Sequence, residues 1–293
     1  MKVLVTGATG FIGQRFVSRL LEAGHQATVI SRSPGTAKRQ FHHSVVCIDW
    51  KTPLPPCDGV VNLMGESIAQ RWNEDVKADI RSSRVGATRL LTERLAGRPL
   101  RFFVSASAVG FYGSRGEEEL TEELTSGSDF LAHVCRDWEQ AVLQSTIHGR
   151  KVVFRFGMVL GRGGGALAKI LPIFKLGLGG PIGDGSQWMS WIHLDDLVEA
   201  LFWACNDERA SGVYNAVSPD PVTGEVFTEK LGKILKRPTW FRVPGKVLKI
   251  AAGEMSSVLL SSQRALPKRL EEAGFRFRYE TLESALSAVV SDR

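Results

Sequence analysis

Three glycines near the start of the chain have the spacing of a phosphate-binding loop. Gly7, Gly10 and Gly13 lie in the stretch TGATGFIG, between a short apolar run and a stretch with helical spacing. One such glycine permits a tight turn, one lets the backbone approach a pyrophosphate, and one lets the helix pack against the strand. Backbone N–H groups at the helix start then face the anion. We therefore expect a dinucleotide to contact Gly7, Thr9, Gly10, Phe11, Ile12 and Gly13.

The end of the second apolar run indicates which dinucleotide binds. An acidic residue at this point would accept hydrogen bonds from the ribose 2′-OH of NAD. The sequence has Ser31 and Arg32 instead. A planar guanidinium can pair with a 2′-phosphate, and the serine can add a hydroxyl donor. An exposed strand-end arginine is the alternative, but the pattern favours NADP(H) over NAD(H), with Lys38 and Arg39 as solvated loop charges.

Short apolar runs alternate with helical patterns through the first two thirds of the chain. The expected strands are Val3–Thr6, Ala27–Ser31, Val45–Asp49, Gly59–Leu63, Phe102–Ser105 and Val152–Phe156. The expected helices include Phe16–Ala23, Ile80–Leu95 and Phe130–Ile147. Near-continuous apolar runs joined by helices indicate a parallel sheet covered on both faces. With right-handed crossovers, this is a Rossmann-type, doubly wound α/β fold.

The pattern changes after about residue 160. A glycine-rich segment, GRGGGALAKILPIFKLGLGGPIGDG, precedes WMSWIHLDDLVEALFWA and then short mixed elements. We expect residues 1–160 to form the NADP-binding domain and residues 161–293 a smaller substrate-binding lobe. Some segments of the second part are expected to return to the sheet, and the two lobes to share one cleft.

Composition and cysteine use limit the possible partners. The 293 residues are 43% apolar and 23% charged, as in a globular protein, with a net charge of +6. No block of lysine and arginine interleaved with aromatic residues stands out, so no nucleic-acid partner is expected. Neither a signal peptide before MKVLVTG nor a membrane span over Val247–Leu260 fits the sequence. The four cysteines, Cys47, Cys57, Cys135 and Cys205, lack metal-ligand spacing and fit reduced thiols in the cytoplasm.

Several motifs together resemble the extended short-chain dehydrogenase/reductase family, which includes nucleotide-sugar epimerases and dehydratases. TGATGFIG has the family form, and Leu63, Met64 and Gly65 look like the strand end that passes the adenine and ribose. The segment SRVGAT resembles the helix that backs the cofactor; Arg84 replaces the usual asparagine, which implies a positive charge facing the phosphates. The segment RFGMVLG, with Phe156, resembles the strand and loop that flank the nicotinamide.

A narrower resemblance rests on longer motifs. VNLMGE, RFGMVLGRGGG, KLGLGGPIGDG, WIHLDD and QRALPKRLEEAGF look like one branch of this family. Its members are called epimerase family proteins or cell-division-inhibitor-like proteins, and they end in a C-terminal domain of unknown function. The resemblance implies common ancestry and does not by itself establish a reaction.

The resemblance also shows where catalytic residues should lie. In the family, a serine or threonine at the end of the fifth strand polarises the substrate carbonyl. A tyrosine on the next helix transfers the proton, and a lysine four residues later lowers the tyrosine pKa. Aligning that helix on Trp138-Glu139 places Leu131 and Cys135 at these two positions. The Tyr-x-x-x-Lys pair is therefore absent.

Substitutes for this pair can be named. Ser107, or alternatively Ser105, stands at the strand end; a serine there can instead bond the cofactor, and we place Ser105 among the cofactor contacts. Tyr112 could swing into the cleft, although core packing is its alternative role. His193 titrates near neutral pH, but it precedes the helix-capping residues Asp195 and Asp196. Cys135 could be a thiolate beside Arg136 or a buried apolar residue. We keep Ser107 and Tyr112 as the catalytic candidates.

A second departure concerns the substrate. Sugar-nucleotide epimerases tend to have an arginine for the substrate diphosphate where this chain has Met189, between Trp188 and Trp191. Methionine and tryptophan favour an apolar or aromatic ligand, unless they only pack the lobe interface. The leading hypothesis is an NADP(H)-dependent oxidoreductase or epimerase-like enzyme, monomeric or homodimeric, acting on an unidentified small carbonyl or alcohol. The alternative is a non-catalytic NADP(H)-binding sensor or regulatory protein.

Overall fold

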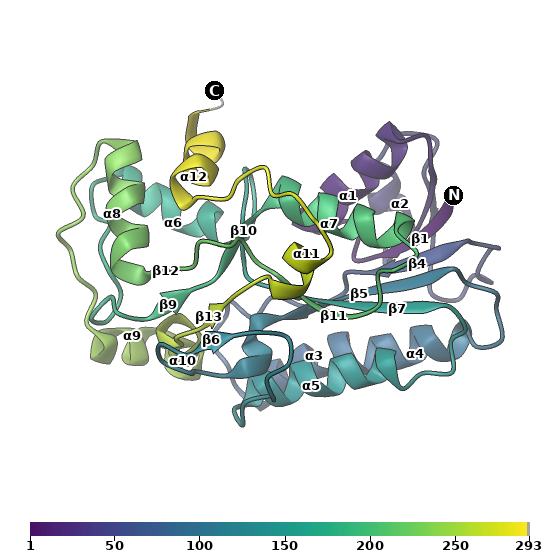
Figure 1. The fold of residues 1–293 in the computed structure, drawn as a ribbon, viewed down its shortest axis with the longest axis horizontal. Helices are drawn as coiled ribbons and strands as arrows, with labels where there is room; N and C mark the ends of the chain where they lie inside the picture. The colour runs from purple at the N-terminus through teal and green to yellow at the C-terminus, as the bar shows by residue number, and fades with distance from the viewer. Residues whose placement is uncertain (292–293) are drawn as a thin grey trace.

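A seven-stranded parallel sheet forms the larger part of the molecule (Figure 1). The computed structural model describes residues 1–291, without the side chains of residues 251 and 252. The strand order is β11-β7-β5-β4-β1-β2-β3. These strands are β1 (Lys2–Thr6), β2 (Gln26–Ile30), β3 (Val46–Ile48), β4 (Gly59–Asn62), β5 (Phe102–Ala108), β7 (Arg150–Phe156) and β11 (Gly212–Ala216). The Rossmann-type fold expected from the sequence is confirmed, and β11 adds an edge strand that the sequence reading missed.

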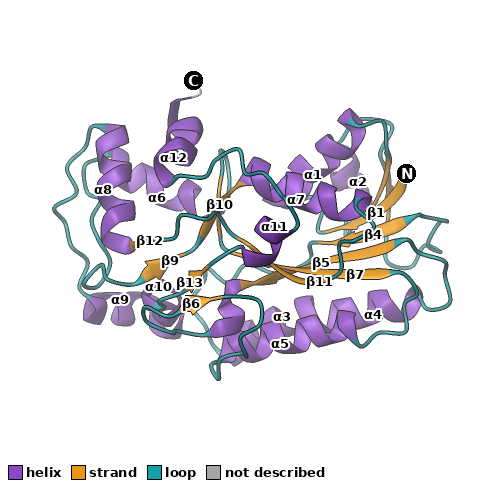
Figure 2. Ribbon diagram, viewed as in Figure 1, coloured by secondary structure: helices purple, strands orange, loops and turns teal. Residues whose placement is uncertain are grey.

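Helices cover both faces of the sheet (Figure 2). On one face lie α3 (Glu74–Arg81), α4 (Ala87–Arg94) and α5 (Phe130–Leu143). The other face carries α1 (Phe11–Glu22), α2 (Pro34–Lys38), α7 (Leu194–Asn206) and α11 (Lys268–Glu272). Fully buried residues of β1, β4, β5 and β7 point to both layers, which explains the near-continuous apolar runs in these strands.

The long helix expected at Ile80–Leu95 is interrupted. It begins earlier, at Glu74, because the Asn73 side chain accepts a hydrogen bond from the Val76 N–H and caps the helix. A π-helical turn, η1 (Ser82–Gly86), then separates α3 from α4. Such turns often occur at functional sites, and this one carries Arg84.

The second lobe is built mainly from α6 (Gly165–Lys175), α8 (Gly224–Leu235), α9 (Gly245–Ala252) and α12 (Leu282–Ser291). Short pieces complete it: β9 (Trp188–Met189) with β12 (Val222–Thr223), and η3 (Gly253–Met255) with α10 (Ser256–Leu260). Its core includes Phe174, Phe227 and Leu286. The chain crosses between the lobes repeatedly. After α6 of the second lobe it returns to the sheet, where α7 covers one face and β11 forms an edge strand.

Two small parallel strand pairs connect the lobes. β8 (Met158–Leu160) pairs with β10 (Trp191–His193), and β6 (Glu119–Leu120) pairs with β13 (Arg264–Ala265). Within residues 1–291, no helix has the length and apolar character needed to cross a bilayer.

Candidate functional site

The glycine-rich turn between β1 and α1 has the geometry of an anion cradle. Gly7 has a φ of +68°, and a Cβ there would lie 2.3 Å from the carbonyl oxygen of Leu63. A Cβ on Gly13 would lie 2.4 Å from the Gly7 carbonyl oxygen, so both positions require glycine. No side chain caps α1 at Gly10, and its first turn contains no acidic residue. The N–H groups at this helix start therefore fit a pyrophosphate.

The other predicted contacts of this turn face different neighbours. The Thr9 carbonyl accepts a hydrogen bond from the Gln14 side chain at 2.8 Å. Ile12 packs against the hydrophobic core between the sheet and the helices α1 and α7. The Phe11 ring lies against the glycine-rich segment of the second lobe. A Cβ on Gly164 would approach this ring to 2.2 Å, and one on Gly161 to 2.8 Å. These two glycines thus let the second lobe pack directly onto the phosphate loop.

Arg32 follows β2, which pairs with β1 in the sheet, and its side chain is largely exposed. Its guanidinium pairs with the Glu66 carboxylate at 2.8 Å, while the Ser31 hydroxyl accepts a hydrogen bond from the Ser33 N–H at 3.2 Å. An exposed pair of this kind contributes only about 0–1 kcal/mol. A 2′-phosphate can therefore replace Glu66 as the partner of Arg32 at little cost.

Arg84 stabilises the loop that follows β4. Its guanidinium donates to the carbonyls of Glu66, at 2.9 Å, and Ile80, at 3.2 Å. A Cβ on Gly65 would lie 3.0 Å from the guanidinium carbon, so the loop lies flat on Arg84. Burial lowers the pKa of Arg84. The two backbone hydrogen bonds hold the loop containing Leu63, Met64 and Gly65 beside the cradle.

A buried polar network that the sequence reading missed ties the strand ends together. Asn62 on β4 accepts a hydrogen bond from the Thr6 hydroxyl at 2.8 Å. Its amide donates to Thr88 at 2.9 Å and to Ser105 at 3.1 Å. The indole of Trp138 also donates to Thr88, at 3.0 Å. Ser105 thus helps to satisfy a fully buried amide.

Ser107 and Tyr112 belong to a second buried network, centred on an ion pair. The Ser107 hydroxyl donates to the Glu139 carboxylate at 2.7 Å. Arg155 donates to both oxygens of that carboxylate at 2.9 Å, and also to the Tyr112 hydroxyl at 2.9 Å. Tyr112 in turn donates to the Asn215 side-chain oxygen at 2.7 Å. Burial raises the pKa of Tyr112, so its hydroxyl stays protonated inside the network.

This network gives both hydroxyls a structural role. Tyr112 is fully buried, and only 2% of Ser107 is exposed. The residue of β5 that reaches the large cavity described below is Ala108. The geometry therefore assigns Ser107 to Glu139 and Tyr112 to Arg155 and Asn215. Sequence patterns could not reveal this, because its members come from β5, α5, β7 and β11.

The helix that would carry the family's acid–base pair is apolar on that face. Leu131 packs against a buried cluster of Trp72, Ile80 and Val134, and Met255 and Val258 of the C-terminal region pack against the same cluster. Cys135 is buried, and burial raises the pKa of its thiol to about 12. Cys135 is thus a neutral core residue, in keeping with the apolar alternative stated for it. Where the family has a tyrosine, this chain uses the helix face to hold another segment.

The WIHLDD segment also has a structural role. The His193 ring accepts a hydrogen bond from the Asp195 N–H at 3.2 Å and lies 3.9 Å from the Tyr279 ring, between centroids. Burial lowers the pKa of His193. Asp196 accepts hydrogen bonds from the N–H groups of Arg278 and Tyr279 at 2.8 and 3.0 Å. These contacts secure the returning C-terminal segment against α7.

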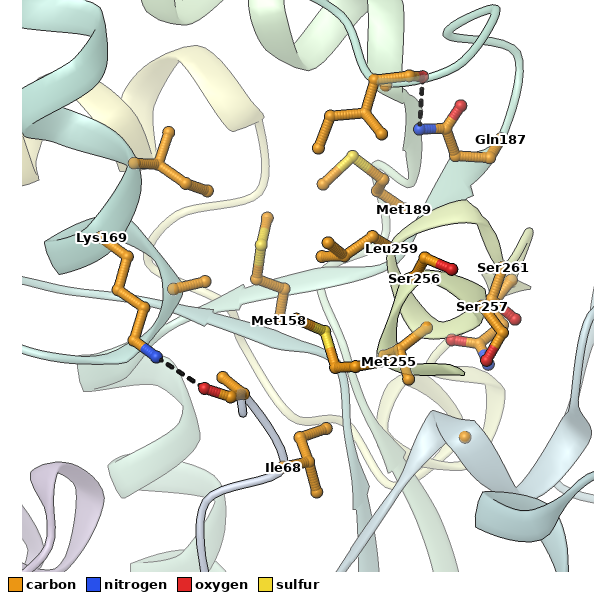
Figure 3. Close-up of a pocket in the computed structure, with 18 of the residues that line it drawn as sticks. Ile68, Met158, Lys169, Gln187, Met189, Met255, Ser256, Ser257, Leu259 and Ser261 are labelled. Carbon is orange, nitrogen blue, oxygen red and sulfur yellow. Dashed lines mark hydrogen bonds between the residues drawn. The ribbon is translucent and has the colours of Figure 1, made fainter. Parts of the chain in front are cut away.

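A cavity of about 1360 Å³ lies between the two lobes. The sheet side contributes Ala108, Leu131 and the stretch from Phe156 to Met158. The second lobe contributes the apolar side chains Ile170, Phe174, Trp188, Met189, Phe227 and Met255. Three methionines, Met158, Met189 and Met255, project into the same space (Figure 3). The lining is therefore apolar and adaptable.

Few charged groups reach this cavity. Among the described residues its lining contains Asp129, Lys169, Lys249 and Glu254, and no arginine. The Asp129 carboxylate is engaged as the cap of α5, accepting the Ala132 N–H at 2.9 Å. Lys169 extends from α6 across the cleft and donates to the Ala69 carbonyl at 3.1 Å (Figure 3). The role of Lys169 in the cavity lining could not be predicted from the sequence, because only the folded chain places α6 opposite residue 69.

Trp188, Met189 and Trp191 do not all have the same role: two of them line the cavity and the third packs in the core. Trp188 and Met189 line the cavity. Trp191 is fully buried, and its indole N–H donates to the Asp220 carbonyl at 2.6 Å. Trp191 therefore packs in the core of the second lobe and does not line the cavity.

Comparison with known proteins fits this geometry. Residues 3–216 match the family model described as "NAD dependent epimerase/dehydratase family". The chain belongs to this family. Residues 243–289 match a domain of unknown function, which in this chain comprises α9, η3, α10, β13, α11 and most of α12. That domain thus supplies Met255 and Leu259 to the cavity.

The similarity to individual members extends over the whole chain. "Epimerase family protein SDR39U1 homolog, chloroplastic" of Arabidopsis thaliana is 40% identical and aligned over 99% of this chain and 87% of its own length. "Epimerase family protein YfhF" of Bacillus subtilis is 38% identical over 100% and 99%. The crystal structure of human epimerase family protein SDR39U1 with NADPH has a TM-score of 0.93, at 34% identity and full coverage of both chains. The branch suggested by the sequence motifs is confirmed.

Proposed function

We propose that this protein is an NADP(H)-dependent oxidoreductase that acts on an apolar carbonyl compound or alcohol. The observation that carries the proposal is the junction of two sites. An anion cradle with Arg32 nearby leads along the sheet to Phe156 and Met158, which line a large apolar cavity. The human relative whose crystal structure contains NADPH supports the choice of cofactor.

The cofactor half of the site needs little more than backbone. The N–H groups at the start of α1 would hold the pyrophosphate, and Arg32 would exchange Glu66 for the 2′-phosphate. Arg84 and the Asn62 network keep the neighbouring loop and strand ends in place. NADPH, when bound, supplies a hydride.

The substrate half orients an apolar molecule and excludes water. Methionine, leucine and phenylalanine side chains can surround an aliphatic or aromatic body. The lining lacks an arginine among the described residues, which disfavours the diphosphate of a nucleotide sugar. The ammonium of Lys169 can donate a hydrogen bond, and then a proton, to a carbonyl oxygen. We assign it this role in place of the missing tyrosine.

A non-catalytic NADP(H) sensor is the second candidate. It is favoured by the loss of every family acid: Leu131 and Cys135 form an apolar face, and Ser107 and Tyr112 are held in the buried ion-pair network. A sensor would need the cradle and Arg32 but no proton donor.

Cofactor titration followed by a substrate screen separates the two candidates. Purified protein is titrated with NADPH and NADH and then mixed with aliphatic and aromatic carbonyl compounds while the nicotinamide absorbance is followed. We expect tighter binding of NADPH, and turnover that favours apolar compounds. NADPH binding without turnover across a broad panel supports the sensor. Failure to bind either cofactor contradicts both.

The role of Lys169 has a matched control on the same helix. Lys169→Met should lower kcat by roughly 100-fold while NADPH affinity is retained, since general acids contribute about 10²–10⁴ in rate. Lys175→Met removes an exposed lysine of α6 that lies outside the cavity lining and should leave kcat unchanged. Equal activity of both variants assigns the proton transfer to water instead.

A further inference from the structure

Large apolar side chains are exposed together at the far end of the second lobe. Leu176 is 74% exposed, Trp240 85% and Ile250 79%. Leu178, Phe241 and Val247 are each more than half exposed. Single exposed apolar residues are ordinary, but a group of six marks a site of interaction.

The segments that carry these residues lie side by side. The stretch from residue 238 to 243 runs along residues 177–183: the Val243 N–H donates to the Pro181 carbonyl, and the Gly183 N–H donates to the Val243 carbonyl, both at 2.9 Å. This stretch belongs to the connection between α8 and α9, which follows the outer edge of the second lobe (Figure 1). We call this surface, with the exposed side of α9, the basic apolar face.

The segment that contributes most of this surface is rich in basic residues. Residues 230–250 contain seven lysines and arginines and no aspartate or glutamate. The whole chain has 37 basic and 31 acidic residues, so the rest of it carries 30 against 31. Lys233, Lys236, Arg237, Lys246 and Lys249 are all exposed, while Arg242 is paired with Glu225 at 2.7 Å. The net positive charge of the protein therefore comes from this one segment.

The basic apolar face is continuous with the opening of the cavity. Leu178, Leu259 and Lys249 line the cavity and are also exposed to solvent. Ile173 of α6, which is 51% exposed, does the same on the opposite side. A molecule that leaves the cavity here meets apolar side chains first and basic groups around them.

We propose that the basic apolar face docks onto an anionic lipid bilayer and presents the cavity opening to it. Exposed tryptophan and aliphatic side chains ringed by lysines are typical of helices and loops that lie in the membrane interface. Each lysine or arginine near an anionic surface contributes about 1 kcal/mol to binding. Exposed Leu176, Val247 and Ile250 have no use on a nucleic acid, where aromatic stacking and phosphate contacts dominate. The further step, that an apolar substrate enters from the bilayer, rests on the proposed function.

Membrane docking differs from what the sequence predicted. No membrane partner was expected, and no block of basic residues interleaved with aromatic residues was recognised. Docking on a bilayer surface differs from a span across the bilayer, which no helix in residues 1–291 could form. Docking on the surface depends instead on which side chains remain exposed after folding. Trp240 and Ile250 would have been equally plausible as core residues.

Vesicle flotation tests the proposal directly. The full-length protein, without cofactor, is mixed with phosphatidylcholine vesicles or with vesicles containing one third phosphatidylglycerol. We expect flotation with the anionic vesicles, reduced at high salt because the charge contribution is screened. Little flotation is expected with the neutral ones. The measurement needs neither NADPH nor turnover, so its result is independent of the enzymatic proposal.

Three variants assign the binding to this face. Lys246→Gln with Lys249→Gln should weaken vesicle partitioning by roughly 25-fold, two charges at about fivefold each. Trp240→Ser with Ile250→Ser should weaken it by roughly tenfold or more. Leu90→Ser, at a 48% exposed position on α4, is the matched control and should float like the unaltered protein.

Other occupants of the face give different results. If a second copy of the chain covers it, the protein sediments as a dimer, Trp240→Ser with Ile250→Ser yields monomers, and vesicles are not bound. Salt-sensitive retention of an RNA or DNA oligonucleotide without flotation identifies a nucleic-acid surface. Either result, or a monomer that binds none of these, overturns the docking proposal.

Discussion

The anion cradle and the interlobe cavity are built in different ways. The anion cradle comes from seven consecutive residues, Gly7 to Gly13, and its fit depends on backbone geometry and missing side chains. The cavity draws its lining from positions between residues 67 and 263, and its fit depends on packed side chains. Backbone requirements leave few alternatives to glycine, whereas an apolar wall accepts many substitutions of similar size. A family can therefore retain its cofactor site while its substrate site changes.

Helix α5 shows how far such a change has gone. Its residues Leu131 and Val134 belong to one apolar cluster with Met255 and Val258, which lie in the C-terminal domain of unknown function. Two turns further along this face, Glu139 pairs with Arg155 inside the molecule. In this chain the helix therefore makes two sets of structural contacts.

The largest effect on stability is expected at the buried ion pair. Arg155→Met leaves Glu139 charged and unpaired in a site where each side chain is at most 5% exposed. Breaking a buried pair by removing one partner costs about 3–5 kcal/mol. Urea unfolding should report this loss. Arg209→Met, which breaks a pair between an exposed arginine and Asp207, should cost far less stability. Similar losses for both variants would contradict the structural role assigned to the network.

Gly7→Ala should abolish cofactor binding through backbone geometry. The new Cβ would collide with the Leu63 carbonyl, and the left-handed φ adds strain. We expect NADPH affinity to fall by more than about 100-fold, with about 3 kcal/mol lost in stability. Gly24→Ala is the matched control: Gly24 has a φ of +74°, but its Cβ would meet nothing within 4 Å. Calorimetric titration should find NADPH affinity unchanged in that variant.

Substitutions at Arg32 and Glu66 sharpen the assignment of the 2′-phosphate. Arg32→Gln should weaken NADPH by roughly 10- to 100-fold, because a hydrogen bond to a charged group contributes about 1.5–3 kcal/mol. NADH affinity should change little. Glu66→Gln removes the competing carboxylate and should tighten NADPH by roughly twofold to fivefold. Equal losses for NADPH and NADH in Arg32→Gln would place the 2′-phosphate elsewhere.

The smallest expected effect is a difference in thiol reactivity, which tests whether Cys135 of α5 is a buried, neutral residue. Burial raises the pKa of the Cys135 thiol to about 12 and raises that of Cys205 as well. Cys47 and Cys57 are only half buried. Iodoacetamide at pH 8 should therefore modify Cys47 and Cys57 first, as peptide mass spectrometry can show. Early modification of Cys135 would indicate a reactive thiol at the family's lysine position and would reopen its catalytic candidacy.

Much of the fold was readable from local patterns. Six of the seven strands of the sheet were predicted, because buried parallel strands appear as continuous apolar runs. The edge strand β11 was missed, since nothing in Gly212–Ala216 indicates that it returns to β7 across the second lobe. The expected helix at Ile80–Leu95 did not reveal its π turn, which depends on the packing around Arg84.

The sequence by itself determined the glycines of the cradle and the absence of the Tyr-x-x-x-Lys pair, and it predicted a preference for NADP(H). Each of these depends on residue type at short spacing, where backbone geometry fixes the outcome. Only the tertiary structure decided that Ser107 and Tyr112 are held by Glu139, Arg155 and Asn215, that Lys169 reaches the cavity, and that Trp240 and Ile250 stay exposed. These outcomes depend on contacts between segments far apart in the chain, and the free energy of such contacts exists only once the sheet and the second lobe have folded together.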